Sequence, residues 1–116
     1  MPEVPPELTD RLARLRHAFL PRSRGEASRL SELQRALLSS DPALVAAAVG
    51  EIHVIAHRLR GTAGTLGFAA ITEAAAEVED AIDACGGQSA LAGLDLARVL
   101  AAPIQQLVTV IEGLAS

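Results

Sequence analysis

Residues 50–68 constrain the fold of this chain most, because they have the pattern expected for the second half of a long amphipathic helix. Apolar residues recur there and just upstream at the three- and four-residue spacing of one helix face. They are Val45, Ala48, Ile52, Ala56, Leu59, Ala63 and Leu66. At about 100° per residue, His57 lies roughly 140° from Ile52, so its imidazole points away from the apolar face.

Glycine residues follow His57 on this outer face, at Gly61 one turn later and at Gly64 two turns later. Each glycine inside a helix costs about 0.8–1.0 kcal/mol relative to alanine, and the usual compensation is close approach of another surface. We therefore expect a partner to approach the imidazole here without meeting a side chain. The spacing of Gly61, Gly64 and Gly67 also fits close packing of a neighbouring helix within the fold, which would bury Gly61 and cover His57.

The segment that begins at His57 reads His-Arg-Leu-Arg-Gly-Thr-Ala-Gly-Thr-Leu-Gly. It resembles the signature of histidine-containing phosphotransfer (HPt) domains, His-x-Leu-Lys-Gly-Ser-Ala-x-x-Leu-Gly. Ile71 and the pair Val78-Glu79 also resemble the next helix of that family. The spacing upstream differs, because Asp41 precedes His57 by sixteen residues, where many family members have a similar turn about ten residues before the histidine. We therefore expect the helix that carries His57 to be longer than usual by more than one turn.

Length and composition predict an all-α domain. The 116 residues are half hydrophobic, but only Phe19 and Phe68 are aromatic. Alanine and leucine, which dominate the composition, are strong helix formers. The predicted fold is an antiparallel four-helix bundle with an additional N-terminal helix. The proline-rich residues 1–6 are expected to be a flexible N-terminus, and residues 7–116 a single HPt-like helical domain.

Apolar spacing and chain breaks predict five helices. They cover residues 7–20, 23–38, 42–66, 69–85 and 94–114. Pro21 ends the first helix. Asp41 is the N-cap and Pro42 the first position of the third helix, which Gly67 ends. In the last helix, Pro103 predicts a kink or a restart.

The predicted helices turn apolar stripes towards a common core. In the first helix the stripe consists of Leu8, Leu12, Leu15 and Phe19. In the fourth it consists of Ile71, Ala74, Ala75, Val78 and Ile82, and in the last of Leu100, Ile104, Leu107, Val108, Ile111 and Leu114. The other side of the fourth helix is acidic and is expected to face solvent. Its residues are Glu73, Glu77, Glu79, Asp80 and Asp83.

The family resemblance implies that His57 is the phospho-acceptor. A neutral imidazole is nucleophilic and titrates close to physiological pH. It would attack a phosphoryl group on an aspartate of a partner, carry it on the outer ring nitrogen, and pass it to another aspartate. Arg60, one turn along, would stabilise the phosphoryl oxygens, at a position where the family usually has lysine. Without the surrounding motif, a solvated surface histidine would be the simpler interpretation of His57.

Seven residues around His57 are assigned to partner docking. They are His53, Val54, Arg58, Gly61, Gly64, Thr65 and Phe68. Val54 is an apolar residue on the outer face beside a reactive group, which is typical of a docking surface, although exposure of one valine is also ordinary. Arg58 either meets an acidic pocket of the partner or is solvated, and the sequence leaves both interpretations open.

His53 lies one turn before His57, and we expect it either to flank the docking surface or to orient His57. Two histidines at positions i and i+4 can also bind a metal ion. No Glu-x-x-His pattern and no cysteine cluster accompanies them, so we expect no metal site. His17, on the first helix, is expected to be a surface residue.

Charge and composition argue against several function classes. The net charge of −4 and the near absence of aromatic residues argue against nucleic-acid binding. No apolar run reaches the ~18 residues of a membrane span, and the N-terminus lacks the basic start and hydrophobic stretch of a secretory signal. Cys85 is the only cysteine, so we expect a reducing, cytoplasmic location. No nucleotide-binding motif is recognisable, so we expect neither a cofactor nor autophosphorylation from ATP.

The resemblance implies a histidine phosphotransfer protein of bacterial two-component signal transduction, which relays a phosphoryl group between receiver-domain aspartates in a multistep His-Asp phosphorelay. Its partners would be receiver domains of response regulators or a hybrid sensor kinase, and Mg²⁺ would be held by the partner receiver. One alternative is a helical adaptor or dimerisation module that binds through the Gly/Val stripe around His57. Another is the dimeric, histidine-bearing half of a kinase-like phosphotransferase. That dimer requires a second apolar face on two helices, which we do not find, so we expect a monomer.

Overall fold

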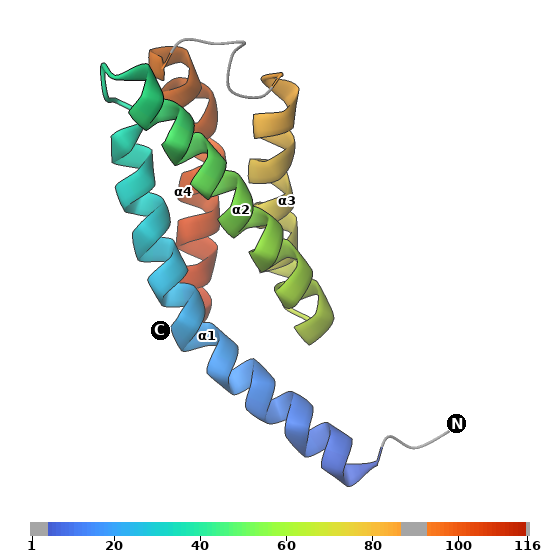
Figure 1. Cartoon of the computed structure of the whole chain (residues 1–116). Helices are drawn as coiled ribbons and strands as arrows, with labels where there is room; N and C mark the ends of the chain where they lie inside the picture. Colours follow the sequence, from blue (N-terminus) through green and yellow to red (C-terminus); the bar gives the residue numbers. More distant parts are fainter. Residues whose placement is uncertain (1–4, 87–92, 116) are drawn as a thin grey trace.

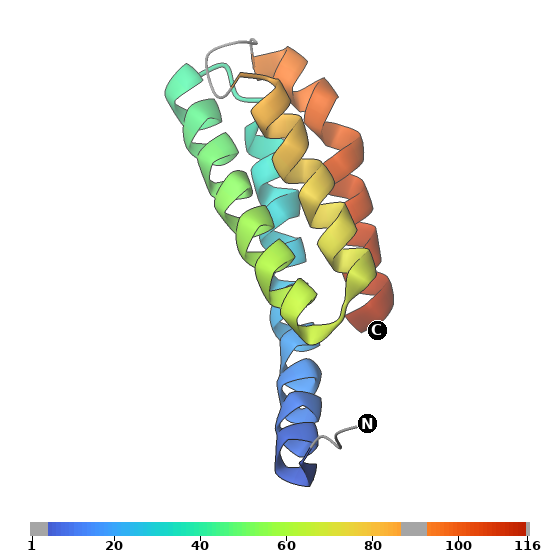
Figure 2. The ribbon, with the colours of Figure 1, turned by 90° about the vertical axis from the view of Figure 1, so that its right-hand side faces the viewer.

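The computed structural model describes residues 5–86 and 93–115, which form four helices and no strand. The helices are α1 (Pro6–Ala36), α2 (Pro42–Leu66), α3 (Ala69–Ala84) and α4 (Gly93–Ala115). Consecutive helices run in opposite directions, and each packs mainly against two neighbours (Figures 1 and 2). The predicted all-α helical bundle is confirmed. Of the predicted flexible N-terminus, residues 1–4 lie outside the described residues, and Pro6 already belongs to α1.

The break predicted at Pro21, between helices over residues 7–20 and 23–38, is wrong, because α1 continues through this proline. A proline removes one backbone N–H donor, and the carbonyl that loses its partner belongs to His17, four residues earlier. His17 is exposed, so water can bond to that carbonyl in place of the missing donor. The predicted additional N-terminal helix is therefore the first half of α1.

The N-terminal half of α1 projects beyond the ends of the other three helices (Figures 1 and 2). We call its residues 6–17 the arm. Leucines predicted to lie in the core are exposed on the arm, with exposed fractions of 47% for Leu8, 38% for Leu12 and 50% for Leu15. Of the predicted stripe only Phe19 is buried. The prediction fails because the apolar stripe of α1 is longer than the bundle that covers it.

The helix α2 begins and ends at the residues predicted from its caps. Asp41 Oδ1 accepts a hydrogen bond of 2.9 Å from the backbone N–H of Ala43, and Pro42 occupies the first turn, where no donor is needed. Gly67 has a φ of +83°, a left-handed conformation that favours glycine. Only Gly67 and Phe68 connect α2 to α3, so the two helices form a tight antiparallel hairpin.

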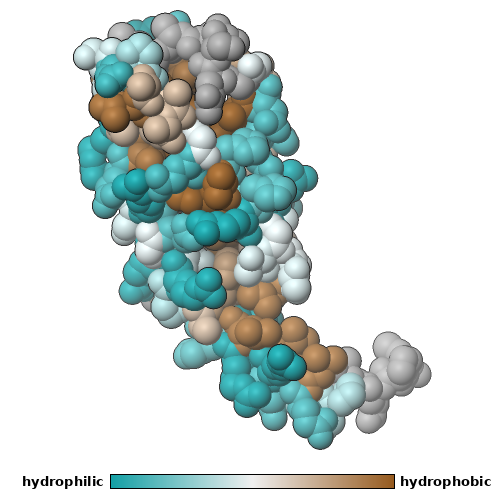
Figure 3. Space-filling view, in the orientation of Figure 1, coloured by the Kyte–Doolittle hydropathy of each residue, from teal (hydrophilic) through white to brown (hydrophobic). Residues whose placement is uncertain are grey.

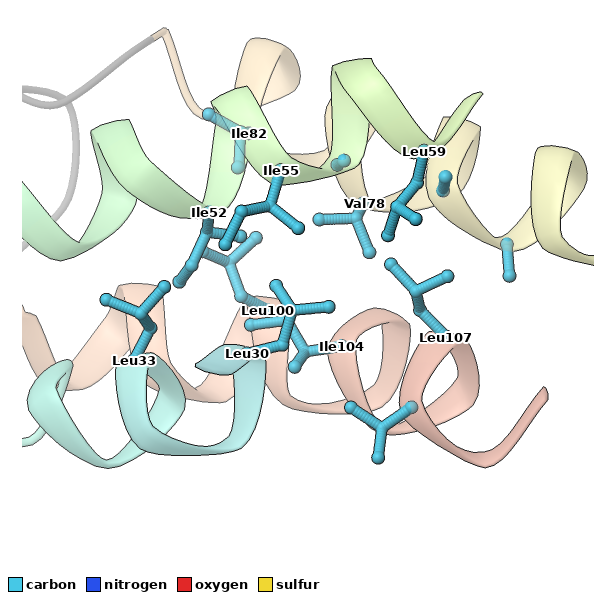
Figure 4. Packing of buried hydrophobic residues seen from close by; sticks show 14 of the residues in the cluster. Leu30, Leu33, Ile52, Ile55, Leu59, Val78, Ile82, Leu100, Ile104 and Leu107 are labelled. Atoms are coloured by element: carbon cyan, nitrogen blue, oxygen red, sulfur yellow. The ribbon is translucent and has the colours of Figure 1, made fainter. Parts of the chain in front are cut away.

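One apolar core runs between the four helices, and Figure 4 shows its packing around Ile52, Ile55 and Leu59 of α2. The inward residues predicted for α2 and α3 are buried, except that Leu66 is half-buried. Val49 and Ile55 are buried in addition. Among the described residues, α2 is the one helix long and apolar enough to span a membrane by composition; here its apolar stripe lies in the core of the bundle.

The helix α4 continues through Pro103, so the predicted restart is wrong. The backbone carbonyl that loses its hydrogen-bond donor at Pro103 belongs to Val99. Val99 is exposed, as His17 is at Pro21, so water can bond to this carbonyl. The inward residues predicted between Leu100 and Ile111 are buried, but Leu114 is exposed in the last turn of the helix.

Candidate functional site

His57 projects from α2 with 73% of its side chain exposed, and one of its two ring nitrogens is bonded to α3. Its Nδ1 atom lies 2.8 Å from Oε2 of Glu79. The other oxygen of the same carboxylate, Oε1, accepts a hydrogen bond of 3.2 Å from Nη1 of Arg60. The carboxylate thus holds the imidazole and the guanidinium side by side on the outer face of the hairpin.

Glu79 was predicted to face solvent on the acidic side of α3, and this prediction is wrong, because only 7% of the residue is exposed. The spacing of Glu79 from apolar residues of α3 could have identified it as buried. Ala75 lies four residues before Glu79 and Ile82 three residues after it, and both are buried. A residue between them on the same stripe faces the bundle whatever its polarity. Because it is buried, its carboxylate needs partners, which His57 and Arg60 supply.

The net effect of this environment lowers the pKa of the Glu79 carboxyl. Burial raises that pKa, but the hydrogen bonds from His57 and Arg60, together with their positive charges, outweigh burial. The carboxylate is therefore ionised at neutral pH and can only accept hydrogen bonds. Nδ1 of His57 therefore donates the proton in this hydrogen bond, and in the uncharged form of the ring, which nucleophilic attack requires, the free lone pair lies on Nε2.

The helix surface beyond His57 is open at Gly61. A Cβ atom built at this glycine would have no atom within 4 Å. At Gly64 a Cβ atom would lie 3.7 Å from the side chain of Thr72 on α3, an ordinary contact. Packing of a neighbouring helix against Gly61, the alternative reading of the glycine spacing, is therefore wrong. A molecule that approaches Nε2 of His57 meets the bare backbone of α2 at Gly61.

His53 lies one turn nearer the start of α2 than His57 and also contacts a carboxylate of α3. Its Nε2 lies 3.2 Å from Oδ1 of Asp83 and 4.0 Å from Oε2 of Glu79. Among residues 5–86 and 93–115, the hydrogen bonds of His53 and His57 go to carboxylates of α3 and not to each other. His53 Nε2 thus lies beside the carboxylate that holds His57.

The other residues assigned to docking lie on the side of α2 that faces α1. Val54 is exposed, as the outer face predicts. Arg58 is not simply solvated, because its Nη2 donates a hydrogen bond of 3.3 Å to Oε1 of Glu26 on α1. The hydroxyl of Thr65 donates a hydrogen bond of 3.1 Å to the carbonyl of Gly61 within the helix.

Phe68 is half-buried at the turn between α2 and α3, where it contacts α1. Its ring stacks on Phe19 with the ring centroids 5.3 Å apart. The guanidinium carbon of Arg16 lies 4.9 Å from the centroid of the Phe68 ring, a cation–π contact. Phe68 therefore fixes the base of the arm against the end of the hairpin.

The arrangement suits nucleophilic chemistry at Nε2 of His57. The ring is fixed by a buried anion, a cation lies beside it, and the approach to its free nitrogen is open. Within the part of the chain that the structure describes, no three His, Cys, Asp or Glu side chains are grouped as ligands for a metal ion. His53 and His57 each face a carboxylate instead.

Comparison with protein families gives one match over most of the chain. The family model described as "Hpt domain" matches residues 6–114. The match begins with α1 and ends in the last turn of α4, so it includes the arm and the whole site around His57. No curated protein and no solved structure gives a match.

Proposed function

Since this chain belongs to the Hpt domain family, we propose that it carries a phosphoryl group on His57 between aspartates of receiver domains. Histidine phosphotransfer in a two-component phosphorelay is what membership of the family implies. Beyond what the family implies, we propose that the residue is His57, that its ring nitrogen Nε2 carries the phosphoryl group, and that the partners are receiver domains. The partners are receiver domains of response regulators or of a hybrid sensor kinase, which hold the aspartyl phosphate and its Mg²⁺.

The transfer step needs little from this chain beyond positioning and charge. The lone pair of His57 Nε2 attacks the phosphorus of the aspartyl phosphate. A bond forms between Nε2 and phosphorus, the bond between phosphorus and the aspartate oxygen breaks, and the carboxylate leaves. No proton has to move, because Nδ1 keeps its proton in the hydrogen bond to Glu79. Attack of a second aspartate on the phosphohistidine reverses the same bonds.

Glu79 stabilises the ring while it carries the phosphoryl group. Attack through Nε2 leaves the imidazole with a positive charge, because both nitrogens are then substituted. The ionised carboxylate of Glu79 lies 2.8 Å from Nδ1 and offsets this charge. Its burial keeps water from replacing the hydrogen bond, so the ring does not have to be reoriented during transfer.

Arg60 is placed to contact the phosphoryl oxygens. It bonds to Glu79 through Nη1, and its side chain is about half exposed. A guanidinium has five N–H donors, so donors remain for an anion beside His57. Hydrogen bonds between a guanidinium and phosphoryl oxygens are charge-assisted and stronger than neutral ones.

One observation carries the proposal: the ring of His57 is anchored at Nδ1 and open at Nε2, with bare helix beside it at Gly61. A surface histidine without a function needs neither a buried carboxylate behind it nor an open approach in front of it. The same observation makes Nε2, and not Nδ1, the expected site of phosphorylation.

The test is transfer from a receiver domain that has been phosphorylated with acetyl phosphate. The wild type and His57→Gln are compared, and His17→Gln, which changes an exposed histidine of α1, is the matched control. We expect label on the wild type and on His17→Gln, and none on His57→Gln. Incubation with MgATP alone should label no variant. Label on His57→Gln would refute the assignment, and phosphorus NMR of the labelled wild type distinguishes Nε2 from Nδ1.

A further inference from the structure

The arm carries an apolar stripe that the bundle does not cover. Leu8, Leu12 and Leu15 are all exposed, and they continue the stripe in which Phe19 is buried. Figure 3 shows a band of hydrophobic surface along the arm, on the side that faces the end of α2. Single exposed leucines are common on protein surfaces, whereas a contiguous row of three is typical of an interaction site.

A groove connects this stripe to the helix that carries His57. Its volume is about 440 Å³, and it lies between the arm and the last turn of α2. The arm contributes Thr9, Leu12, Ala13 and Arg16, and α2 contributes Gly64, Thr65 and Leu66, with Gly67 just beyond its end. Gly64 lies on the same side of α2 as His57 and two turns further on, a distance of about 10 Å along the helix. The open surface at His57 therefore continues into the groove and onto the leucines.

The base of the arm is held in place against the hairpin. Phe68 stacks on Phe19, and Arg16 lies over the Phe68 ring. About two turns further along α1 from Phe19, Glu26 pairs with Arg58 of α2. These contacts set the direction in which the arm leaves the bundle, so the leucines have a defined position relative to His57.

A phosphotransfer partner that contacts His57 also lies close to the groove and the arm. A domain of about 100 residues has a radius of gyration of about 13 Å, so one centred on His57 covers a groove that begins about 10 Å away. The surface beside His57 is poor in apolar contacts, because Gly61 and Gly64 have no side chain, and among the residues that the structure describes Val54 is the exposed large apolar residue beside them. A specific interface buries roughly 800 Å² on each partner, and the arm with the groove at its base offers further apolar area.

We propose that the leucines of the arm and the groove at its base form the apolar part of the docking surface for the receiver domain that exchanges a phosphoryl group with His57. This inference rests on the proposed function, since it takes the partner from that function. A second copy of this chain is a poorer occupant. The exposed stripe from Leu8 to Leu15 spans about one heptad, whereas the apolar pattern typical of a coiled coil extends over at least three or four.

The experiment uses the whole chain and a variant with Leu8→Gln and Leu12→Gln, because glutamine is a good helix former and both positions are exposed. The matched control is Leu44→Gln, an exposed leucine in the first turn of α2, at the far end of the bundle. Transfer from a receiver domain phosphorylated with acetyl phosphate is measured at increasing receiver concentration. Circular dichroism checks that each variant is folded, and sedimentation velocity reports its oligomeric state.

We expect the arm variant to raise the half-saturating receiver concentration about tenfold, which corresponds to about 1.4 kcal/mol, and to leave the rate at saturation unchanged. The control should match the wild type in both values. Equal half-saturation for the arm variant and the wild type would overturn this inference alone. A wild type that self-associates through the arm, with an arm variant that is monomeric and transfers normally, would assign the leucines to a dimer instead. No transfer to the wild type would overturn the proposed function, and this inference with it.

Discussion

His57 Nδ1 and Glu79 Oε2 lie 2.8 Å apart because the hairpin of α2 and α3 brings equivalent turns together. His57 is nine residues before the end of α2 at Leu66, and Glu79 is ten residues after the start of α3 at Ala69. One turn further from the connection, the same register pairs His53 with Asp83. The tight connection through Gly67 thus determines which carboxylate stands behind the reactive ring.

Replacement of Glu79 by glutamine tests what this carboxylate does. Glu79→Gln keeps the shape of the side chain but removes the charge, and its amide can donate to His57 as well as accept from it. A hydrogen bond to a charged group contributes about 1.5–3 kcal/mol, so we expect transfer to slow roughly 10- to 100-fold. The measurement is the single-turnover rate from a phosphorylated receiver domain at saturation.

The control for this substitution is Glu77→Gln, which removes an exposed carboxylate from the same helix. It should transfer at the wild-type rate. Nitrogen-15 NMR of the imidazole provides a second readout, since the glutamine amide can accept from Nδ1 or donate to it and should no longer fix the proton there. An unchanged tautomer and an unchanged rate together would show that the carboxylate is only a packing element.

The lowered pKa of Glu79 predicts how stability depends on pH. Because the folded-state pKa lies below the ordinary value of 4.5, the unfolded chain binds the proton more readily. The stabilisation is therefore fully present above about pH 4.5 and is lost as the pH falls through the folded-state pKa. Urea unfolding between pH 7 and pH 3 should show a free energy of unfolding that falls less steeply below pH 4.5 in Glu79→Gln than in the wild type. Parallel curves would contradict the pKa assignment.

Local signals in the sequence were sufficient for α2 and its reactive face. Asp41, Pro42 and Gly67 act through their own backbone and capping atoms, so the ends of this helix could be predicted without knowledge of its neighbours. The same local rule failed at Pro21, because α1 continues there with the loss of one backbone hydrogen bond, and Phe19 just before the proline is buried in the core. Exposure of the carbonyl of residue 17 to water depends on the tertiary structure.

The partners of His57 were harder to predict than His57 itself. Glu79 is predicted to face solvent because it is acidic. Its spacing from Ala75 and Ile82, however, places it on the buried stripe of α3. The exposure of Leu12 could not be read from its helical spacing, because a stripe shows which side of a helix is apolar and not how far the other helices extend. Both errors arise where contacts between helices decide the outcome.

His53 should be dispensable for the transfer step. Its Nε2 lies 3.2 Å from Oδ1 of Asp83 and 4.0 Å from Oε2 of Glu79. Because the contact between His53 and Asp83 lies at the surface, with 36% and 66% of the two side chains exposed, its loss should cost no more than about 0.2–1 kcal/mol. We expect His53→Gln to accept the phosphoryl group at a rate within about fivefold of the wild type. Loss of all transfer would make His53 a second essential residue.

Substitutions at Gly61 separate effects on helix stability from effects on phosphoryl transfer. A Cβ atom at this position meets no other atom, so Gly61→Ala and Gly61→Gln should both stabilise the helix by up to about 1 kcal/mol. Thermal unfolding measures this gain. Gly67→Ala is the contrasting variant, because its φ of +83° strains any other residue, and it should lower the melting temperature.

The two substitutions at Gly61 should differ in transfer. The methyl group of Gly61→Ala leaves most of the approach to His57 open, whereas the longer side chain of Gly61→Gln covers the space in which the aspartyl phosphate of the partner must lie. We expect Gly61→Ala to stay within about threefold of the wild-type rate, and Gly61→Gln to lose at least about 100-fold, or about 2.7 kcal/mol of barrier. Both variants are predicted to be at least as stable as the wild type, so a slow Gly61→Gln cannot be ascribed to unfolding. Normal transfer by a folded Gly61→Gln would mean that the partner reaches Nε2 from another direction.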